Sequence, residues 1–213
     1  MTLRLDSPAA PNLPQGAESY SKVYQDQLNN VLRLYFNRLE NITRSLLGPD
    51  GGRFMSNPFG AWSSDSDQAA VSTTAAYAIT YDVTDVADSV YLQGNSKLTV
   101  TYPGVYNLQF SIQFNNTDTK IHDVDVWAAI NGTNLSNSNS RFSVPNSHGG
   151  VDGHLIASLN LFLTMQTDDY VELYWATTNT SVTIENLPAA VSPTRPATPS
   201  VIATMAFVSS IPA

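Results

Sequence analysis

The sequence has no cysteine and few charged residues. Of its 213 residues, Asp, Glu, Lys and Arg make up only 13%, whereas hydrophobic residues make up 42%. The absence of cysteine excludes a disulfide scaffold and a thiolate zinc site. No apolar run approaches the roughly 18–20 residues of a membrane span, so we expect no membrane insertion. A disordered chain would have fewer aromatic and β-branched residues and more charge.

The residues that are abundant are small and polar. Ser, Thr and Asn together make up 61 of the 213 residues. With Val and Tyr, they form a composition that is typical of β-strands joined by polar turns.

Charge is unevenly divided along the chain. The net charge is −8 and the isoelectric point is about 4.6, which argues against nucleic-acid binding. Residues 1–53 carry a net charge of +1, and residues 54–213 carry a net charge of −9. This change predicts two segments with different roles.

Residues 1–17 are predicted to form an extended arm. They contain Pro8, Pro11 and Pro14, and they lack the apolar stretch of a signal peptide, so we expect folding in a cytoplasm. A disordered tail is the alternative. If the arm instead lies along a partner, its anchors are expected to be Leu3, Leu5 and Leu13.

Residues 18–47 are predicted to form one helix that ends before Gly48-Pro49. Its apolar residues follow a 4-3-4-3-4 spacing, typical of a coiled-coil seam of about three heptads. The expected trimer seam consists of Leu28, Leu32, Tyr35, Leu39, Ile42 and Leu46. A helix packed on its own domain is the alternative, although we favour a self-associating bundle.

Residues 48–76 are rich in Gly, Pro and Ser and are predicted to be a linker, followed by a head domain over residues 77–213. In the head, apolar and polar residues alternate with a period of 2, which indicates strands with one buried face. Eight or more such strands predict a mainly β fold, an antiparallel β-sandwich of the jelly-roll type. The alternating stretches are 77–83, 98–102, 106–114, 124–130, 155–163, 171–175, 182–184 and 201–207.

The outward positions of these strands are mostly Gln, Asn, Ser and Thr. Uncharged polar faces pack well against copies of themselves, and they also suit contact with carbohydrate. We favour oligomerisation.

Part of the chain resembles known proteins. The run YPGVYNLQFSIQF resembles the G-x-Y strand of the complement globular-head and tumour necrosis factor-like jelly roll, and LNLFLTMQTDDYVELYW resembles its strand–turn–strand pair. The final strand, ATMAFV, occupies the place of its closing strand. The run VPNSHGGVDGHLIASLNLFLTMQTDDYVELYW, with AAYAITYD upstream, is similar to virion appendage proteins of tailed bacteriophages, notably marine phages.

This resemblance covers about residues 57–210 and implies a homotrimer in which three heads pack through their uncharged faces. It also implies a virion protein, assembled in the host cytoplasm, that contacts other phage capsid, neck or tail proteins. The collagen stalk of the animal proteins is absent here and the helix takes its place, so no animal ligand binding is transferred.

We expect no enzymatic activity, cofactor or metal. The alternation turns His122 away from Asp123 and Asp125, which argues against a catalytic pair. In the run SHGGVDGH, His148, Asp152 and His154 match no standard metal spacing, although a metal site there is an alternative. We favour a loop shaped by its glycines.

The leading hypothesis is therefore a non-enzymatic, homotrimeric fibre, spike or decoration protein, anchored by its N-terminal arm. The alternative is an adhesin whose head binds a host glycan or protein. Exposed Trp127 and Tyr174 could stack on sugars, although we favour packing at the trimer interface. Residues 131–146 and 187–200 are expected to be outward-facing loops. The candidate receptor or interface residues are Trp127, Asn134, Asn137, Asn139, His148, His154 and Tyr174.

Overall fold

The computed structural model describes residues 10–16, 18–47 and 57–212, with the backbone alone at residues 45–47. The chain forms two compact units, Met1–Ser56 and Asn57–Ala213. Two of the expected anchors, Leu3 and Leu5, and the side chain of the seam residue Leu46 lie outside the described part.

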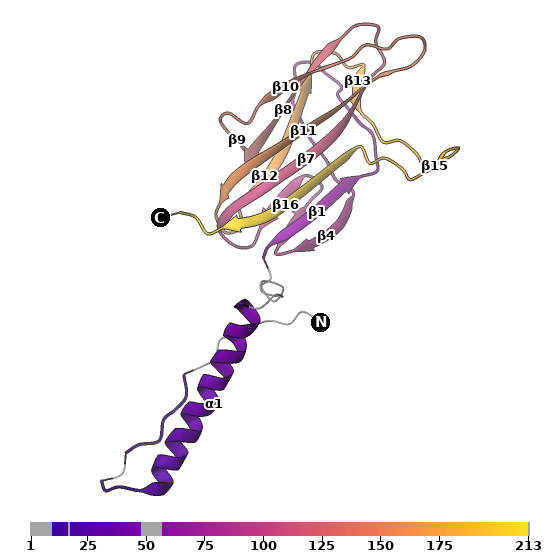
Figure 1. Ribbon diagram of the computed structural model, residues 1–213. Helices are drawn as coiled ribbons and strands as arrows, with labels where there is room; N and C mark the ends of the chain where they lie inside the picture. The colour runs from indigo at the N-terminus through magenta and orange to yellow at the C-terminus, as the bar shows by residue number, and fades with distance from the viewer. Residues whose placement is uncertain (1–9, 17, 48–56, 213) are drawn as a thin grey trace. The chain divides into compact units, whose positions relative to one another are not determined.

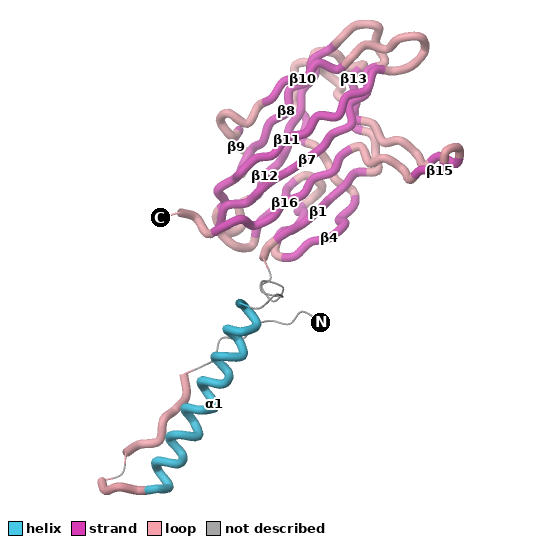
Figure 2. The backbone as a smooth tube through the Cα atoms, in the orientation of Figure 1, coloured by secondary structure: helices cyan, strands magenta, loops and turns pink. Residues whose placement is uncertain are grey.

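The first unit is built on helix α1, Lys22–Leu47. The helix begins four residues later than predicted because Ser21 caps it: its hydroxyl accepts a hydrogen bond from the backbone N–H of Tyr24 at 3.3 Å. Residues 10–16 have no regular structure and run alongside the helix (Figure 2). Within this stretch the anchor candidate Leu13 is 52% exposed.

The second unit is mainly β, as predicted, and contains two seven-stranded antiparallel sheets (Figure 1). We call them sheet A and sheet B. Sheet A consists of β1 (Phe59–Ser64), β2 (Gln68–Ala69), β4 (Val83–Asp88), β7 (Gly104–Asn116), β11 (Gly153–Met165), β13 (Val182–Ile184) and β16 (Val201–Ser209). Sheet B consists of β3 (Tyr77–Ala78), β5 (Val90–Gln93), β6 (Lys97–Val100), β8 (His122–Ile130), β9 (Thr133–Asn134), β10 (Ser140–Val144) and β12 (Tyr170–Thr177).

Strand β7 pairs with three other strands of sheet A. Strand β11 pairs with β7 along all thirteen of its residues, from Gly104–Met165 to Asn116–Gly153. Strands β16 and β13 share the other edge of β7, at residues 105–112 and 114–116. Among the described residues, the second edge of β11 pairs with no strand, so β11 is an edge strand of sheet A.

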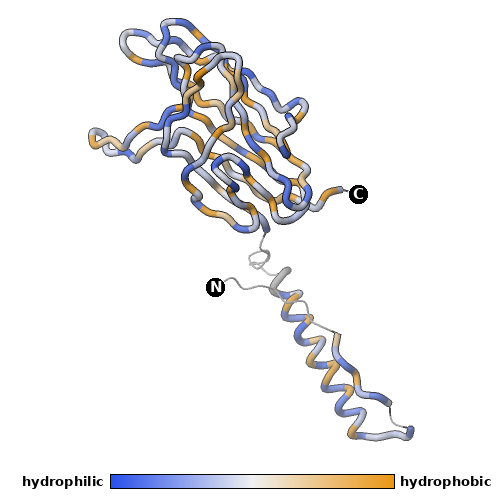
Figure 3. Tube along the Cα trace, turned by 180° about the vertical axis from the view of Figure 1, so that it is seen from behind, coloured by the Kyte–Doolittle hydropathy of each residue, from blue (hydrophilic) through white to orange (hydrophobic). Residues whose placement is uncertain are grey.

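The core lies between the two sheets, where the apolar positions of each alternation meet. Phe114 of β7 and Trp175 of β12 join the sheets, with ring centroids 5.7 Å apart. Trp62, Tyr106 and Leu173 are also at most 1% exposed. This face-to-face packing is that of a β-sandwich, and the alternation along its strands can be followed by colour in Figure 3.

The predicted linker is wrong over much of its length. Strand β1 lies within residues 48–76 and pairs with β4 and β16 in sheet A. The folded unit therefore starts at Asn57 rather than at residue 77. The reason is Trp62, which is fully buried in the core and packs over Gly60, where a side chain would collide with the indole.

The two predicted loops also contain strands. Residues 131–146 include β9 and β10, both paired with β8. Residues 187–200 include a separate two-stranded ribbon, β14 (Ala190–Val191) and β15 (Thr194–Arg195). Strands β8 and β9 are connected by a tight turn at Asn131-Gly132, where both residues have positive φ angles, 51° and 77°.

No helix in the described ranges is long and apolar enough to cross a membrane.

Candidate functional site

The outer face of sheet B carries an aromatic pair. Trp127 of β8 and Tyr174 of β12 are cross-strand partners, and their rings stack with centroids 6.0 Å apart and an interplanar angle of 18°. The indole is also held at its polar end, because Trp127 Nε1 donates a hydrogen bond to Asn134 Oδ1 at 2.9 Å. Trp127 is therefore a partly exposed side chain with a fixed orientation.

Beside Trp127, the surface is hollowed into an open depression of about 370 Å³. Such a volume lies within the range of about 300–1,000 Å³ for small-molecule sites. The lining is mainly apolar with several amide groups, and consists of Asp125, Trp127, Asn134, Leu135, Asn137, Asn139 and Ala176. Tyr174 is not part of it, so the stacked phenol supports the indole from outside the depression.

Asp125, which lines the depression, is held by an ion pair. Arg141 of β10 donates from Nε to Asp125 Oδ1 at 3.1 Å and from Nη2 to Asp125 Oδ2 at 2.7 Å. Asn139 Nδ2 donates to Asp125 Oδ1 at 3.2 Å. These hydrogen bonds, the one from Arg141 first, lower the pKa of the Asp125 carboxyl. The pair fixes the segment that carries Asn137 and Asn139 against strand β8.

Tyr174 is oriented by a second carboxylate. Its hydroxyl donates to Glu172 Oε2 at 3.3 Å, and Glu172 also accepts from Ser96 Oγ at 2.6 Å. Burial, followed by the nearby Glu172 charge, raises the pKa of Tyr174. The phenol stays protonated at neutral pH and supports the stack.

Five of the seven candidate receptor or interface residues meet at this place: Trp127, Asn134, Asn137, Asn139 and Tyr174. Sequence reasoning missed Asp125, Leu135, Arg141 and Ala176. The alternation already places Asp125 on the same face as Trp127. Arg141 was not identifiable, because its proximity depends on the pairing of β10 with β8.

His148 and His154 belong to a different region. The backbone groups of His148 and Val151 bond each other across Gly149 and Gly150, which have φ angles of 63° and 80°. His154 lies at the start of β11, with its Nδ1 3.5 Å from Glu185 Oε2. In the described part of the chain, no group of three or more His, Asp or Glu side chains is arranged to hold a metal ion.

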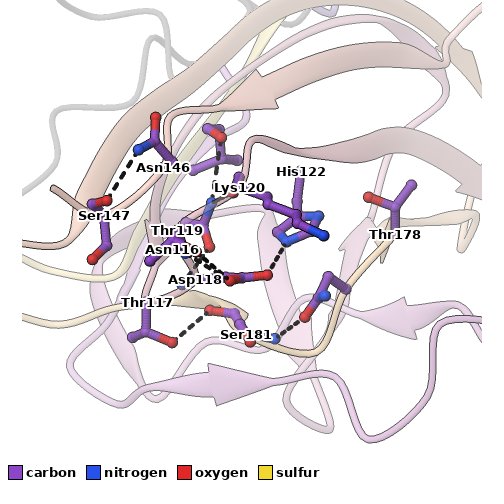
Figure 4. A network of polar contacts seen from close by, with 12 residues as sticks. Asn116, Thr117, Asp118, Thr119, Lys120, His122, Asn146, Ser147, Thr178 and Ser181 are labelled. Atoms are coloured by element: carbon purple, nitrogen blue, oxygen red, sulfur yellow. Dashed lines mark hydrogen bonds and ion pairs between the residues drawn. The ribbon is translucent and has the colours of Figure 1, made fainter.

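His122 has a partner that sequence reasoning did not identify. Its Nε2 lies 2.7 Å from Asp118 Oδ2, in the turn between β7 and β8 (Figure 4). The side chain of Asn116, which is fully buried, donates to the carbonyls of Lys120 and Pro145 and accepts from the backbone N–H of Asp118. The network fastens this turn to the end of β10, which indicates a structural role for His122.

The outer face of sheet A differs from that of sheet B because its strands β7, β11 and β16 contain no Asp, Glu, Lys or Arg. Apart from His154 at the start of β11, the outward positions along the middle of these strands are amides, hydroxyls or apolar groups. They are Asn107, Gln109, Ser111, Gln113, Ile156, Ser158, Asn160, Phe162, Ile202, Thr204 and Ala206. We call this set the uncharged face.

The uncharged face has both projections and hollows. Phe162 is 65% exposed and Ile156 is 59% exposed. One open hollow, of about 240 Å³, lies over Ser111 and Thr204. A second, of about 400 Å³, lies over Ser158 and Asn160. Large apolar side chains therefore stand next to positions where small side chains leave space.

Helix α1 also keeps apolar surface uncovered. Of the predicted seam, Leu39 is 37% exposed, whereas Leu28, Leu32, Tyr35 and Ile42 are partly buried. Phe36 is 59% exposed and lines, with Leu39, an open groove of about 510 Å³. The seam residues share one side of the helix, as the spacing predicts.

The chain matches no protein-family model and no curated protein.

Proposed function

We propose that this chain is a non-enzymatic structural protein of a tailed-phage virion, a homotrimeric appendage whose jelly-roll head projects from an N-terminal anchor. The uncharged face is the observation that carries the self-association. Ordinary solvent-facing strands bear more charge, and interfaces between identical subunits are depleted of it. The virion assignment is supported by the resemblance of about residues 57–210 to phage appendage proteins.

The shape of the uncharged face supports packing against a copy of itself. Exposed Phe162 and Ile156 supply apolar anchors, and the hollows over Ser111 and Ser158 can receive a neighbour's side chains. Strand β11 belongs to this face, and its second edge pairs with no strand among the described residues. A neighbour would therefore cover an apolar surface and an unpaired strand edge together.

The helix supports the same conclusion. A coiled-coil seam buries apolar residues between helices, and Leu39 is still 37% exposed in the single chain. Three parallel helices would cover it. The arm before the helix would then reach a capsid, neck or tail partner through Leu13 and the residues that precede it.

Sedimentation equilibrium of the full chain tests this proposal. We expect a mass of three times 23.1 kDa. The double variant Thr204→Glu/Ser158→Glu should weaken association, because it places two buried carboxylates in each subunit contact. The control Gln93→Glu/Asn95→Asp adds the same charge to the exposed β5–β6 turn and should leave the mass unchanged. A full chain that stays monomeric at micromolar concentration contradicts the proposal.

A further inference from the structure

We propose that the depression beside Trp127 binds a neutral saccharide. The inference stands on the outer face of sheet B and does not rest on the assembly proposed above, which uses sheet A. Three features of the depression support it: a rigid aromatic surface, a set of unused amide groups and a charge balance that disfavours acidic ligands.

The aromatic surface suits the apolar C–H face of a sugar ring. Trp127 is fixed by the Tyr174 stack and by its hydrogen bond to Asn134, so little side-chain entropy is lost when a ligand binds. Leu135 and Ala176 extend the apolar surface. A ring lying on the indole would bury apolar area on both partners.

The amides supply hydroxyl recognition. Asn134 uses only its Oδ1, for the indole, and among the described residues neither its Nδ2 nor the Asn137 side chain forms a hydrogen bond. Each amide can donate and accept, which matches sugar hydroxyls that also do both. Asp125 adds an acceptor, because Oδ2 receives only one hydrogen bond, from Arg141.

The charges around the depression indicate which saccharides fit. Two carboxylates, Asp125 and Asp123, lie near one guanidinium, that of Arg141. The local sum is negative, so a uronate or sialylated ligand would be repelled. A protein partner is disfavoured for another reason: an interface closing over the depression would have to pair every amide or leave it buried without a partner.

The three tryptophans provide a direct readout. Trp62 and Trp175 are 0% and 1% exposed, so acrylamide quenching of the fluorescence of the full chain reports on Trp127. The probes are neutral glucan, mannan and galactan oligosaccharides, with alginate and hyaluronate oligosaccharides as acidic counterparts. We expect at least one neutral probe, at up to about 10 mM, to shield Trp127 and bind with a Kd of about 1 mM or tighter.

Variants measured by calorimetry locate the site. Trp127→Ala should weaken binding at least about tenfold and Asn137→Ala about three- to tenfold. Trp127→Phe keeps an aromatic ring and serves as a second variant in case Trp127→Ala misfolds. It should retain part of the affinity. The matched controls are Tyr91→Ala, an exposed aromatic on β5, and Asn95→Ala, an exposed amide; both should bind like the unchanged protein.

Four results would overturn the inference: no probe shields Trp127, only acidic probes do, Trp127→Ala and Asn137→Ala bind as well as the controls, or Trp127 is already shielded without saccharide. The last would place Trp127 between subunits. The assembly variant Thr204→Glu/Ser158→Glu should bind saccharide normally, so failure of the assembly proposal is distinguishable from failure of this one.

Discussion

Gly153 begins strand β11 at a place where no side chain fits. A Cβ at this position would collide with the backbone carbonyl oxygen of Pro145, which belongs to the segment after β10. The backbones approach this closely because the Asn116 side chain hydrogen-bonds both to the Pro145 carbonyl and to the backbone of the β7–β8 turn. Gly153 is therefore required by space, without any unusual φ angle.

We predict that Gly153→Ala lowers the free energy of unfolding by about 2–4 kcal/mol, because backbone must move to accept the methyl group. Urea denaturation measures this. The control is Gly94→Ala, which has open space but a φ of 65° and should cost about 1 kcal/mol. Equal losses in the two variants would show that the close approach is relieved at little cost.

Asp118 makes the stability of the fold depend on pH in the acid range. The hydrogen bond from His122, followed by that from the Thr119 backbone, lowers the pKa of the Asp118 carboxyl. Because the pKa of Asp118 is lower in the folded than in the unfolded state, the ionised carboxylate stabilises the fold above the unfolded-state pKa of about 4. This stabilisation is lost as the pH falls through the folded-state pKa.

Asp118→Asn should therefore be less stable than the unchanged protein at neutral pH, and the difference should shrink below about pH 4. Denaturant titrations at several pH values measure it. Asp85→Asn serves as control, since Asp85 is exposed and its side chain forms no hydrogen bond in the described ranges. A difference for Asp118→Asn that is the same at acid and neutral pH would contradict this account.

Single elements show which parts of the fold the sequence could predict. Long strands such as β7 and β11 were predicted because buried and outward positions alternate along all of β11 and along β7 up to Phe114. Strand β1 was missed because its sequence, FGAWSS, has two consecutive buried serines after Trp62, and the alternation is lost. Its burial depends on pairing with β4 and β16, which are distant in sequence.

The candidate site, like the fold, could be predicted only in part from the sequence. Trp127 and the asparagines could be selected by residue type, since exposed indoles and amides suit recognition. That they form one depression depends on β9 and β10 folding back onto β8, in a stretch predicted to be a loop. Register between strands of different segments is a tertiary property that one sequence does not contain.

For helix α1, we predict that Leu32→Asp/Leu39→Asp weakens self-association by at least about tenfold, because a carboxylate in a coiled-coil seam must be desolvated. Analytical ultracentrifugation measures the shift. Asn37→Asp is the control, since Asn37 is exposed and lies about half a turn away from the seam. Association that is unchanged in the double variant would show that the heads associate without the helix.

Over the whole molecule, charge is separated from the surface proposed to meet other subunits. Arg141–Asp125 lies on sheet B, and His154–Glu185 lies at the start of β11, outside the uncharged face. The uncharged face itself lies on sheet A. Assembly would therefore be driven by apolar burial and amide hydrogen bonds, while the net charge of −8 keeps separate assemblies apart.

This separation predicts that self-association is insensitive to salt. Between about 0.05 M and 0.5 M NaCl the association constant should change less than about threefold, because contacts without charge are not screened. Light scattering across this range measures it. Dissociation that increases steeply with salt would mean that ion pairs hold the subunits together.

The edge of β11 that pairs with no strand among the described residues would limit how long a subunit could remain unassembled, if the chain associates as proposed. Apart from His154, its thirteen residues include no proline, lysine or other charged residue, which are the residues that usually protect strand edges from pairing with other chains. A newly folded head thus presents a template to which any extended peptide can add. Coverage of this edge by a neighbouring subunit would then compete with its pairing to other chains, and the rate at which subunits meet would decide how much of the protein escapes aggregation.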